Sequence, residues 1–198
     1  MKTELEKVRI YVRVKWYILI FALAVITLET VQGITGAIAA GAFYGSVAIL
    51  AATNILLWLL LRRRIFSQAI SYASLIIEML VVVAAIYLNG GPENPWWFMP
   101  VFIIFIACYV LDFSAAVFMA ALAFICITVL FELEFFALVP HFSTYHTPAS
   151  NWRHGGYMID YLSGMLLLYS AGAFLSGLFN QTMQRYADEL QEKADALA

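Results

Sequence analysis

Charged side chains are scarce in this 198-residue chain, at 12% of the residues. The 11 Lys and Arg against 13 Asp and Glu leave a formal net charge of −2, which excludes the large basic surface needed to bind a nucleic acid. There are only 2 cysteines, and both Cys108 and Cys126 lie inside apolar runs. We therefore expect small buried thiols there, rather than a disulfide or a metal site.

Apolar residues dominate the composition. They make up 64% of the chain, and aromatic residues alone make up 16%, whereas ordinary soluble domains have about 45–50% apolar residues. A helix needs about 20 apolar residues to cross a ~30 Å hydrocarbon layer, so the chain has room for at most six or seven crossings. The sequence predicts an integral membrane protein embedded in a lipid bilayer, with no soluble domain of useful size.

The apolar stretches predict an all-α fold, a polytopic bundle of six transmembrane helices. Helices are expected because lipid offers no partner to backbone polar groups, and the runs are too long and too continuously apolar for barrel strands. The first run has a long charged leader and no convincing cleavage site, so we expect it to remain as a span. The predicted spans are 16–32, 37–61, 69–88, 96–111, 114–139 and 157–180.

The distribution of lysine and arginine predicts the orientation. Basic residues precede the first span and follow the second and the sixth, whereas the alternate loops contain only Arg153. Both termini are therefore expected in the cytoplasm, with residues 1–15 as a basic N-terminal segment. The basic residues on the predicted cytoplasmic side are Lys2, Lys7, Arg9, Arg13, Lys15, Arg62, Arg63, Arg64, Arg185 and Lys193.

The C-terminal segment, residues 181–198, is polar with a regular apolar spacing of four, three, four and three. The series is Met183, Ala187, Leu190, Ala194 and Leu197. Such an a/d seam predicts the start of a cytoplasmic coiled coil that joins two copies of the chain as a homodimer. A seam that still runs at the last residue suggests that a further domain follows. The alternative is a solvated amphipathic helix.

Acidic residues inside the predicted spans need a reason, because a carboxylate near the bilayer centre costs on the order of 2.5–3.5 kcal/mol on insertion scales. Glu78 lies halfway along the third span, and Glu29 lies at the outer end of the first. We expect Glu78 to face the bundle and to meet Asn54 or Thr53, either as a polar clamp or as a proton or ligand site. Glu29 is expected at the wet interface.

Two further acids lie in the outer third of the fifth span. Glu132 and Glu134 are two residues apart, so they point to different sides of a helix, and we assign Glu134 to the interior. The histidines are His141, His146 and His154, five and eight residues apart. Imidazole and carboxylate groups can bind a divalent metal, but this spacing matches no compact motif. We expect loop residues and no metal, with a site on these histidines as the weaker alternative.

The stretch "NGGPENPWWFMPV", residues 89–101, is a short segment rich in turn-forming residues between two apolar runs. Gly90 and Gly91 allow positive φ, and Pro95 suits a first helical turn. Trp96 and Trp97 fit an aromatic belt at the level of the lipid headgroups. Taken alone, the pattern favours an ordinary turn with interfacial anchors.

Two motifs, one in this stretch and one at residues 132–141, resemble those of a known family. "GGPENPWWFMP" resembles the GGxxNPF or GGxxSPF element of six-span sensor histidine kinases, of the redox-sensing RegB/PrrB type and the pilus-regulating PilS type. "ELEFFALVPH" resembles the Glu-to-Pro-His ending of the fifth span in related kinases. The matching residues are Gly90, Gly91, Asn94, Pro95 and Pro100 in the first motif and Glu134, Pro140 and His141 in the second, with Trp96 where phenylalanine is usual.

The resemblance implies the membrane input domain of a two-component signal-transduction kinase in the bacterial cytoplasmic membrane. It also implies a response regulator as partner and quinone as the candidate cofactor, because RegB-like sensors are thought to bind quinone near this element. The implied ligand-binding residues are Gly90, Gly91, Asn94, Pro95, Trp96, Trp97, Glu134 and His141. No phosphoacceptor or ATP-binding motif is found in the 198 residues, so we expect no enzymatic activity from this chain.

Two other functions remain open at this stage. A small transporter or channel would use Glu78 and Glu134 as proton or cation sites, although the sequence has no obvious internal repeat. The same sensor could also serve a different output enzyme, such as a diguanylate cyclase.

Overall fold

The computed structural model describes residues 2–32, 37–63, 65, 67–91, 95–142 and 155–196, which form helices joined by turns and short irregular segments. This confirms the all-helical class. The elements are α1 (Lys2–Val31), α2 (Ala37–Arg62), α3 (Gln68–Leu88), the short 3-10 helix η2 (Pro95–Phe98), α4 (Pro100–Val110), α5 (Phe113–Phe135) and α6 (Gly155–Ala196).

Several of these helices can cross a membrane. Within the described residues, five are long and apolar enough: Leu5–Val31, Ala39–Arg62, Gln68–Leu88, Phe113–Phe135 and Gly155–Asp195. The stretch predicted as the fourth span is divided between η2 and α4. Helix α4 has 11 residues, so it is about 16 Å long, roughly half of the hydrocarbon thickness. The division falls at Pro100, which takes the first position of α4 because it has no backbone N–H to donate.

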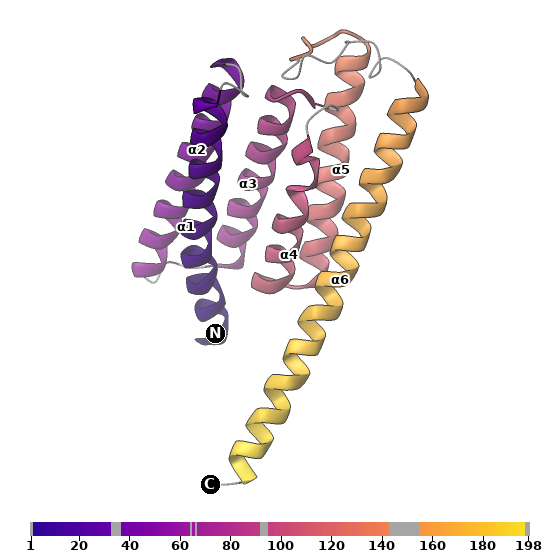
Figure 1. Cartoon of the computed structure of the whole chain (residues 1–198). Helices are drawn as coiled ribbons and strands as arrows, with labels where there is room; N and C mark the ends of the chain where they lie inside the picture. The colour runs from indigo at the N-terminus through magenta and orange to yellow at the C-terminus, as the bar shows by residue number, and fades with distance from the viewer. Residues whose placement is uncertain are drawn as a thin grey trace.

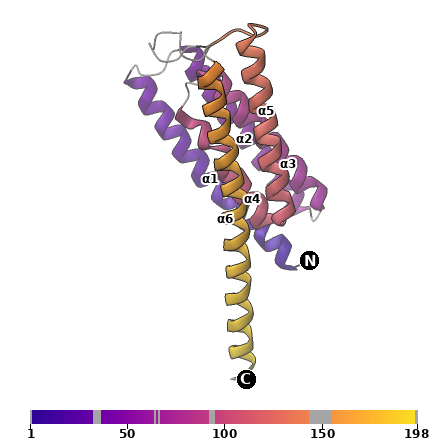
Figure 2. The same ribbon diagram turned by 90° about the vertical axis from the view of Figure 1, so that its right-hand side faces the viewer.

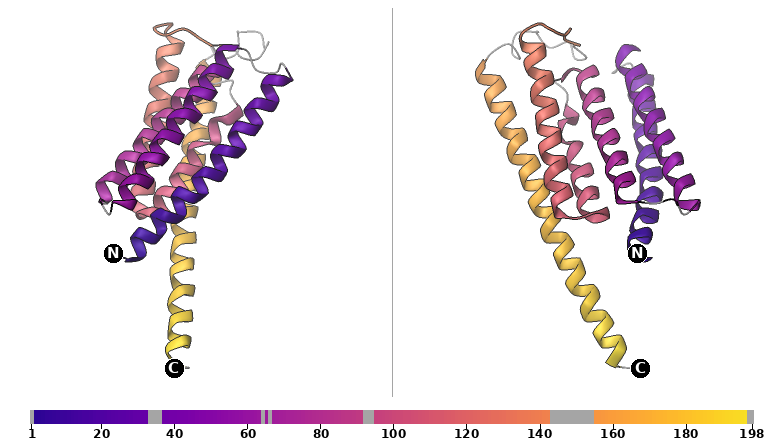
Figure 3. Two further views of the ribbon diagram at one scale, coloured as in Figure 1. Left: turned by 90° about the vertical axis from the view of Figure 1, so that its left-hand side faces the viewer. Right: turned by 180° about the vertical axis from the view of Figure 1, so that it is seen from behind.

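The helices run alternately up and down the bundle (Figure 1). Helix α1 packs on α2, helices α4, α5 and α6 pack on one another, and α3 contacts members of both groups. Two views from the side and from behind show the same arrangement (Figure 3). Small residues allow close packing: Ala107, Ala116 and Ala123 are fully buried, and a Cβ on Gly177 would lie 2.6 Å from the Phe113 ring.

Helix α6 is much longer than a membrane crossing requires. Its 42 residues correspond to about 63 Å, roughly twice the hydrocarbon thickness. The first part packs in the bundle and the last part projects beyond it as one continuous helix (Figure 2). The predicted boundary at residue 181 therefore lies inside a helix. In the single chain Met183 and Leu190 are 52% and 67% exposed.

We call the end of the bundle toward which α6 projects the tail end, and the opposite end, where α3 and α5 finish, the turn end. Helix α1 begins near the tail end, and α6 finishes beyond it (Figure 1). Helix α5 finishes at Phe135, short of the predicted 139, because the chain leaves the helix in a turn in which Ala137 has a φ of 56°. This turn precedes Pro140.

Candidate functional site

The glycine pair at the turn end adopts the positive φ that the sequence predicts, 108° at Gly90 and 51° at Gly91. Gly91 also lies directly against Glu134, since a Cβ on Gly91 would come within 2.7 Å of Glu134 Oε2. A side chain at position 91 would thus meet both backbone strain and a clash.

Glu134 is the buried member of the acidic pair, as predicted. It is 1% exposed, whereas Glu132 is exposed. Its Oε1 forms a short hydrogen bond with Nδ1 of His141, on the segment that follows α5. The structure therefore brings together Gly91, Glu134 and His141, three of the residues that the family resemblance implied as ligand-binding.

Contacts around this group tie the end of α3 to the segment after α5. The Tyr87 hydroxyl donates a hydrogen bond of 2.6 Å to the main-chain carbonyl of Pro140. The Tyr87 ring meets the Phe142 ring edge to face, with centroids 5.4 Å apart. These contacts join the end of α3 to the segment after α5 beside Gly91, Glu134 and His141.

The two tryptophans of η2 contact different parts of the bundle. Trp96 lines an apolar pocket formed by α1, α2 and α3, with a volume of about 190 Å³. Trp97 meets the Tyr161 ring of α6 at 5.8 Å between centroids, and its carbonyl accepts a hydrogen bond of 2.8 Å from the Tyr169 hydroxyl. Helix η2 therefore joins the pocket to α6.

The pocket beside Trp96 suits a small flat or chain-like lipophilic ligand. Phe21 and Phe43 line it together with Trp96, and Glu29 and Ser46 contribute its polar groups. Its volume is below the about 300–1,000 Å³ of sites for drug-sized ligands, so it offers room for a ring or a hydrocarbon chain. An aromatic ring of a ligand can stack on Trp96. The carbonyl groups of a quinone need hydrogen-bond donors, and few polar groups line this pocket.

A second polar cluster lies buried deeper in the bundle, around Glu78. The Glu78 carboxylate pairs with the ammonium of Lys15 and accepts hydrogen bonds from the hydroxyls of Tyr11 and Ser74, the latter at 3.0 Å. The side chains of Lys15 and Glu78 are 6% and 5% exposed. Because the opposite charge and the donors are all provided by the protein, the cluster is a satisfied clamp between α1 and α3.

Of the two predicted partners of Glu78, Asn54 was wrong and Thr53 contacts Glu78 only through Lys15. Asn54 donates instead to the main-chain carbonyl of Val12, at 3.1 Å. Thr53 reaches Glu78 only through Lys15, whose Nζ donates to the Thr53 hydroxyl at 3.1 Å. Lys15, the last residue of the predicted basic segment 1–15, is buried within the continuous helix α1.

Sequence reasoning missed Lys15 and Tyr11 because the lysine directly precedes an apolar run and so was assigned to the helix flank. The spacing along α1 contained the signal. Val8, Tyr11, Val12, Lys15 and Leu19 recur at helical intervals and are all buried. A lysine on the apolar face of a helix predicts a buried carboxylate as its partner, because a buried charge needs an opposite charge. Glu78 is that partner.

The structure describes only some of the other predicted site residues. Pro95 begins η2 as expected, whereas Asn94, His146 and His154 lie outside the described residues. Among the described His, Cys, Asp and Glu side chains, no three gather closely enough to hold a metal ion. Cys108 and Cys126 are both free thiols.

Comparison of the chain with protein-family profiles, with curated proteins and with solved structures finds no match.

Proposed function

We propose that this chain is the membrane-embedded input domain of a sensor histidine kinase, in which a lipophilic ligand beside Trp96 changes the packing of α6. The observation that carries the proposal is the position of η2. Its consecutive residues Trp96 and Trp97 contact the apolar pocket and α6 respectively. A ligand that displaces Trp96 thus acts on the segment that holds α6 through Trp97.

The length and continuity of α6 support transmission of this change. A helix of 42 residues without interruption carries a rotation or a shift along its axis from the bundle to its projecting part. Packed helices have discrete arrangements, so a small displacement at η2 can select between two packings of α6. The ligand must bind one of the two packings more tightly than the other, because only a difference in affinity shifts the equilibrium.

The finer parts of the proposal follow the family resemblance. The chain crosses the bacterial cytoplasmic membrane six times with both termini in the cytoplasm, and two copies pair through the seam of residues 183–197. The paired helices lead to a kinase that phosphorylates a response regulator. Quinone is the candidate ligand, with its ring on Trp96 and its tail among the apolar side chains of α1 and α2.

The test is binding of a quinone analogue to the purified chain in lipid nanodiscs, followed by quenching of tryptophan fluorescence and by thermal unfolding. Loss of the aromatic contact in Trp96→Ala is expected to weaken binding by ~1 kcal/mol or more, about fivefold. Phe174→Ala is the control, because Phe174 is an exposed aromatic residue of α6 away from this pocket. If the analogue does not bind the unmodified chain, or if both variants lose affinity equally, the pocket is not the input site.

A second candidate function, a small transporter or channel, draws on the burial of both Glu78 and Glu134. Buried acids in membrane helices often mark proton or ion pathways. The charge of Glu78 is already matched by Lys15, which favours a structural role. Proton or cation flux into vesicles containing the purified chain, abolished by Glu134→Gln, would favour the transporter over the sensor.

A further inference from the structure

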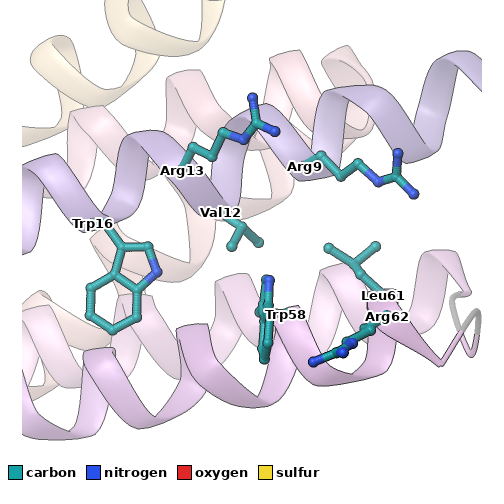
Figure 4. A pocket seen from close by; sticks show the side chains of 7 residues that line it. All are labelled: Arg9, Val12, Arg13, Trp16, Trp58, Leu61 and Arg62. Atoms are coloured by element: carbon teal, nitrogen blue, oxygen red, sulfur yellow. The ribbon is translucent and has the colours of Figure 1, made fainter.

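A second pocket lies between α1 and α2 at the tail end, away from the part of these helices that lines the pocket beside Trp96. It has a volume of about 370 Å³, and three arginines and two tryptophans line it: Arg9, Arg13 and Trp16 from α1, and Trp58 and Arg62 from α2 (Figure 4). The α1 residues follow helical intervals of four and three, and the α2 residues are four apart. Each set therefore belongs to one face of its helix.

The charge of this pocket is positive and unbalanced. No acidic residue lines it. Among the side chains that the structure describes, no carboxylate forms an ion pair with Arg9, Arg13 or Arg62. The guanidinium of Arg62 instead lies over the Trp58 ring, 5.5 Å from its centroid. The three arginines give this side of α1 and α2 a positive charge, which an anion bound among them would offset.

Apolar residues form the floor of the pocket and its continuation toward the middle of the helices. Val12 and Leu61 are buried beneath the arginines, at 3% and 6% exposure. Next to the arginines stand Trp16 and Trp58, which are 37% and 46% exposed. One further helical turn along the same faces, the exposed side chains are Ile20 and Ile55.

We propose that this pocket binds the headgroup of an anionic phospholipid, with its phosphate among Arg9, Arg13 and Arg62 and its acyl chains along Trp16, Trp58 and the apolar side chains beyond them. Guanidinium groups match phosphate oxygens in pairs of parallel hydrogen bonds. Basic pockets between membrane helices and tryptophans at headgroup level are the features by which membrane proteins hold such lipids.

The position of the pocket along the helices favours a lipid over a soluble anion. The candidate spans are Leu5–Val31 and Ala39–Arg62, so Arg9 and Arg62 lie near the tail-end limits of the two spans. From there the lining changes from charged to aromatic to aliphatic in the direction of the bilayer centre. This order matches the headgroup, glycerol region and acyl chains of a phospholipid, whereas a free phosphate would use only the arginines.

The experiment measures lipid retention by the purified chain. The protein is reconstituted in vesicles of phosphatidylcholine alone or of phosphatidylcholine mixed equally with phosphatidylglycerol, extracted in mild detergent, and weighed with its bound lipid by native mass spectrometry. We expect preferential retention of phosphatidylglycerol. The double variant Arg9→Gln/Arg62→Gln is expected to lose about thirtyfold in affinity, since one basic residue near the surface contributes about fivefold.

Arg63→Gln is the matched control. It removes one positive charge, where the double variant removes two, at the position next to Arg62. Arg63 is exposed and does not line the pocket. It should therefore keep nearly all of the retention. If Arg63→Gln loses as much as the double variant, the effect is one of general surface charge and the site is wrong.

Two further measurements decide the outcome even if the double variant folds poorly. Retention of phosphatidylglycerol by the unmodified chain must fall as salt is raised, because salt screens exposed charges. Glycerol phosphate must compete much less well than the intact lipid. The proposal is wrong if the chain retains both lipids equally or if retention does not depend on salt. If glycerol phosphate competes as well as the intact lipid, the pocket is a site for a free anion instead.

Discussion

The hydroxyl of Tyr169 in α6 donates a hydrogen bond of 2.8 Å to the main-chain carbonyl of Trp97 in η2. Tyr169 is only 1% exposed and belongs to the part of α6 that packs in the bundle. The bond fixes the height of α6 relative to the segment that carries Trp96 and its pocket. Together with the contact between the Trp97 and Tyr161 rings, it links the segment of the candidate ligand site to α6.

Removal of this link is expected to destabilise the bundle modestly. Tyr169→Phe leaves the Trp97 carbonyl without its partner and should lower the free energy of unfolding by ~0.5–1.5 kcal/mol. Thermal unfolding in nanodiscs measures this loss. Tyr186→Phe is the control, since Tyr186 is 60% exposed on α6. Equal effects of the two substitutions would show that the hydrogen bond does not hold α6.

Gly91 is expected to tolerate no side chain. Gly91→Ala places a Cβ at a φ of 51° and 2.7 Å from Glu134 Oε2. The left-handed backbone alone costs ~1–2 kcal/mol for a residue with a Cβ, and the clash adds to it. Gly45→Ala in α2, where nothing lies within 4 Å, should instead stabilise the helix slightly, by ~0.5–1 kcal/mol. Denaturant unfolding of both variants gives the comparison.

Lys15 and Glu78 should behave as one unit. Lys15→Met leaves a buried carboxylate without its opposite charge and should cost ~3–5 kcal/mol, whereas Lys15→Met/Glu78→Gln should recover most of this loss. The readout is a double-mutant cycle of unfolding free energies. Lys193→Met, on the projecting part of α6, is the control with the same change of side chain. An additive cycle would contradict the clamp.

Asp112 should give a specific dependence of stability on pH. The hydroxyl of Ser114 and the backbone N–H of Ala115 donate to its carboxylate at the start of α5, and these bonds lower the pKa of Asp112 from its ordinary value of 3.8. A lowered pKa in the folded state means that the charged form adds stability above the unfolded pKa. That contribution is lost as the pH falls below 3.8 through the folded pKa.

The check compares Asp112→Asn and Asp112→Ala with the unmodified chain by thermal unfolding across acidic pH. Asparagine keeps the capping oxygen but cannot titrate. The difference in unfolding temperature between Asp112→Asn and the unmodified chain should therefore shrink as the pH falls below 3.8. Alanine removes the cap and should cost ~0.5–2 kcal/mol near neutral pH. If the difference does not change with pH, the carboxylate charge at the cap has no effect on stability.

Dimerisation through the seam of α6 is expected to depend on Leu190. Leu190→Asp places a charge among the apolar contacts of the paired helices and should weaken the dimer. Cysteine crosslinking at position 190 or 183 in native membranes detects the pair. Glu189→Asp, at the neighbouring position outside the a/d series, is the control. No crosslink at either seam position would remove the dimer from the proposed function.

The sequence by itself determined the features that depend on local chemistry. Long uncharged runs had to be helices because lipid leaves backbone groups no other partner. Gly90 and Gly91 were identified as positive-φ positions, and Glu134 was correctly separated from Glu132 because residues two apart point to different sides of a helix. Pro95 likewise was expected in a first helical turn, and it begins η2.

Only the tertiary structure decided which distant side chains meet. Glu78 pairs with Lys15 and Tyr11, which are 63 and 67 residues away along the chain. Hydrophobic periodicity tells which face of a helix is buried, but it does not tell which face of another helix covers it. The same limit applies to Trp96, whose pocket is formed by α1, α2 and α3, and to Trp97, whose partners lie on α6. Burial is encoded locally, whereas partners follow from how all the helices pack at once.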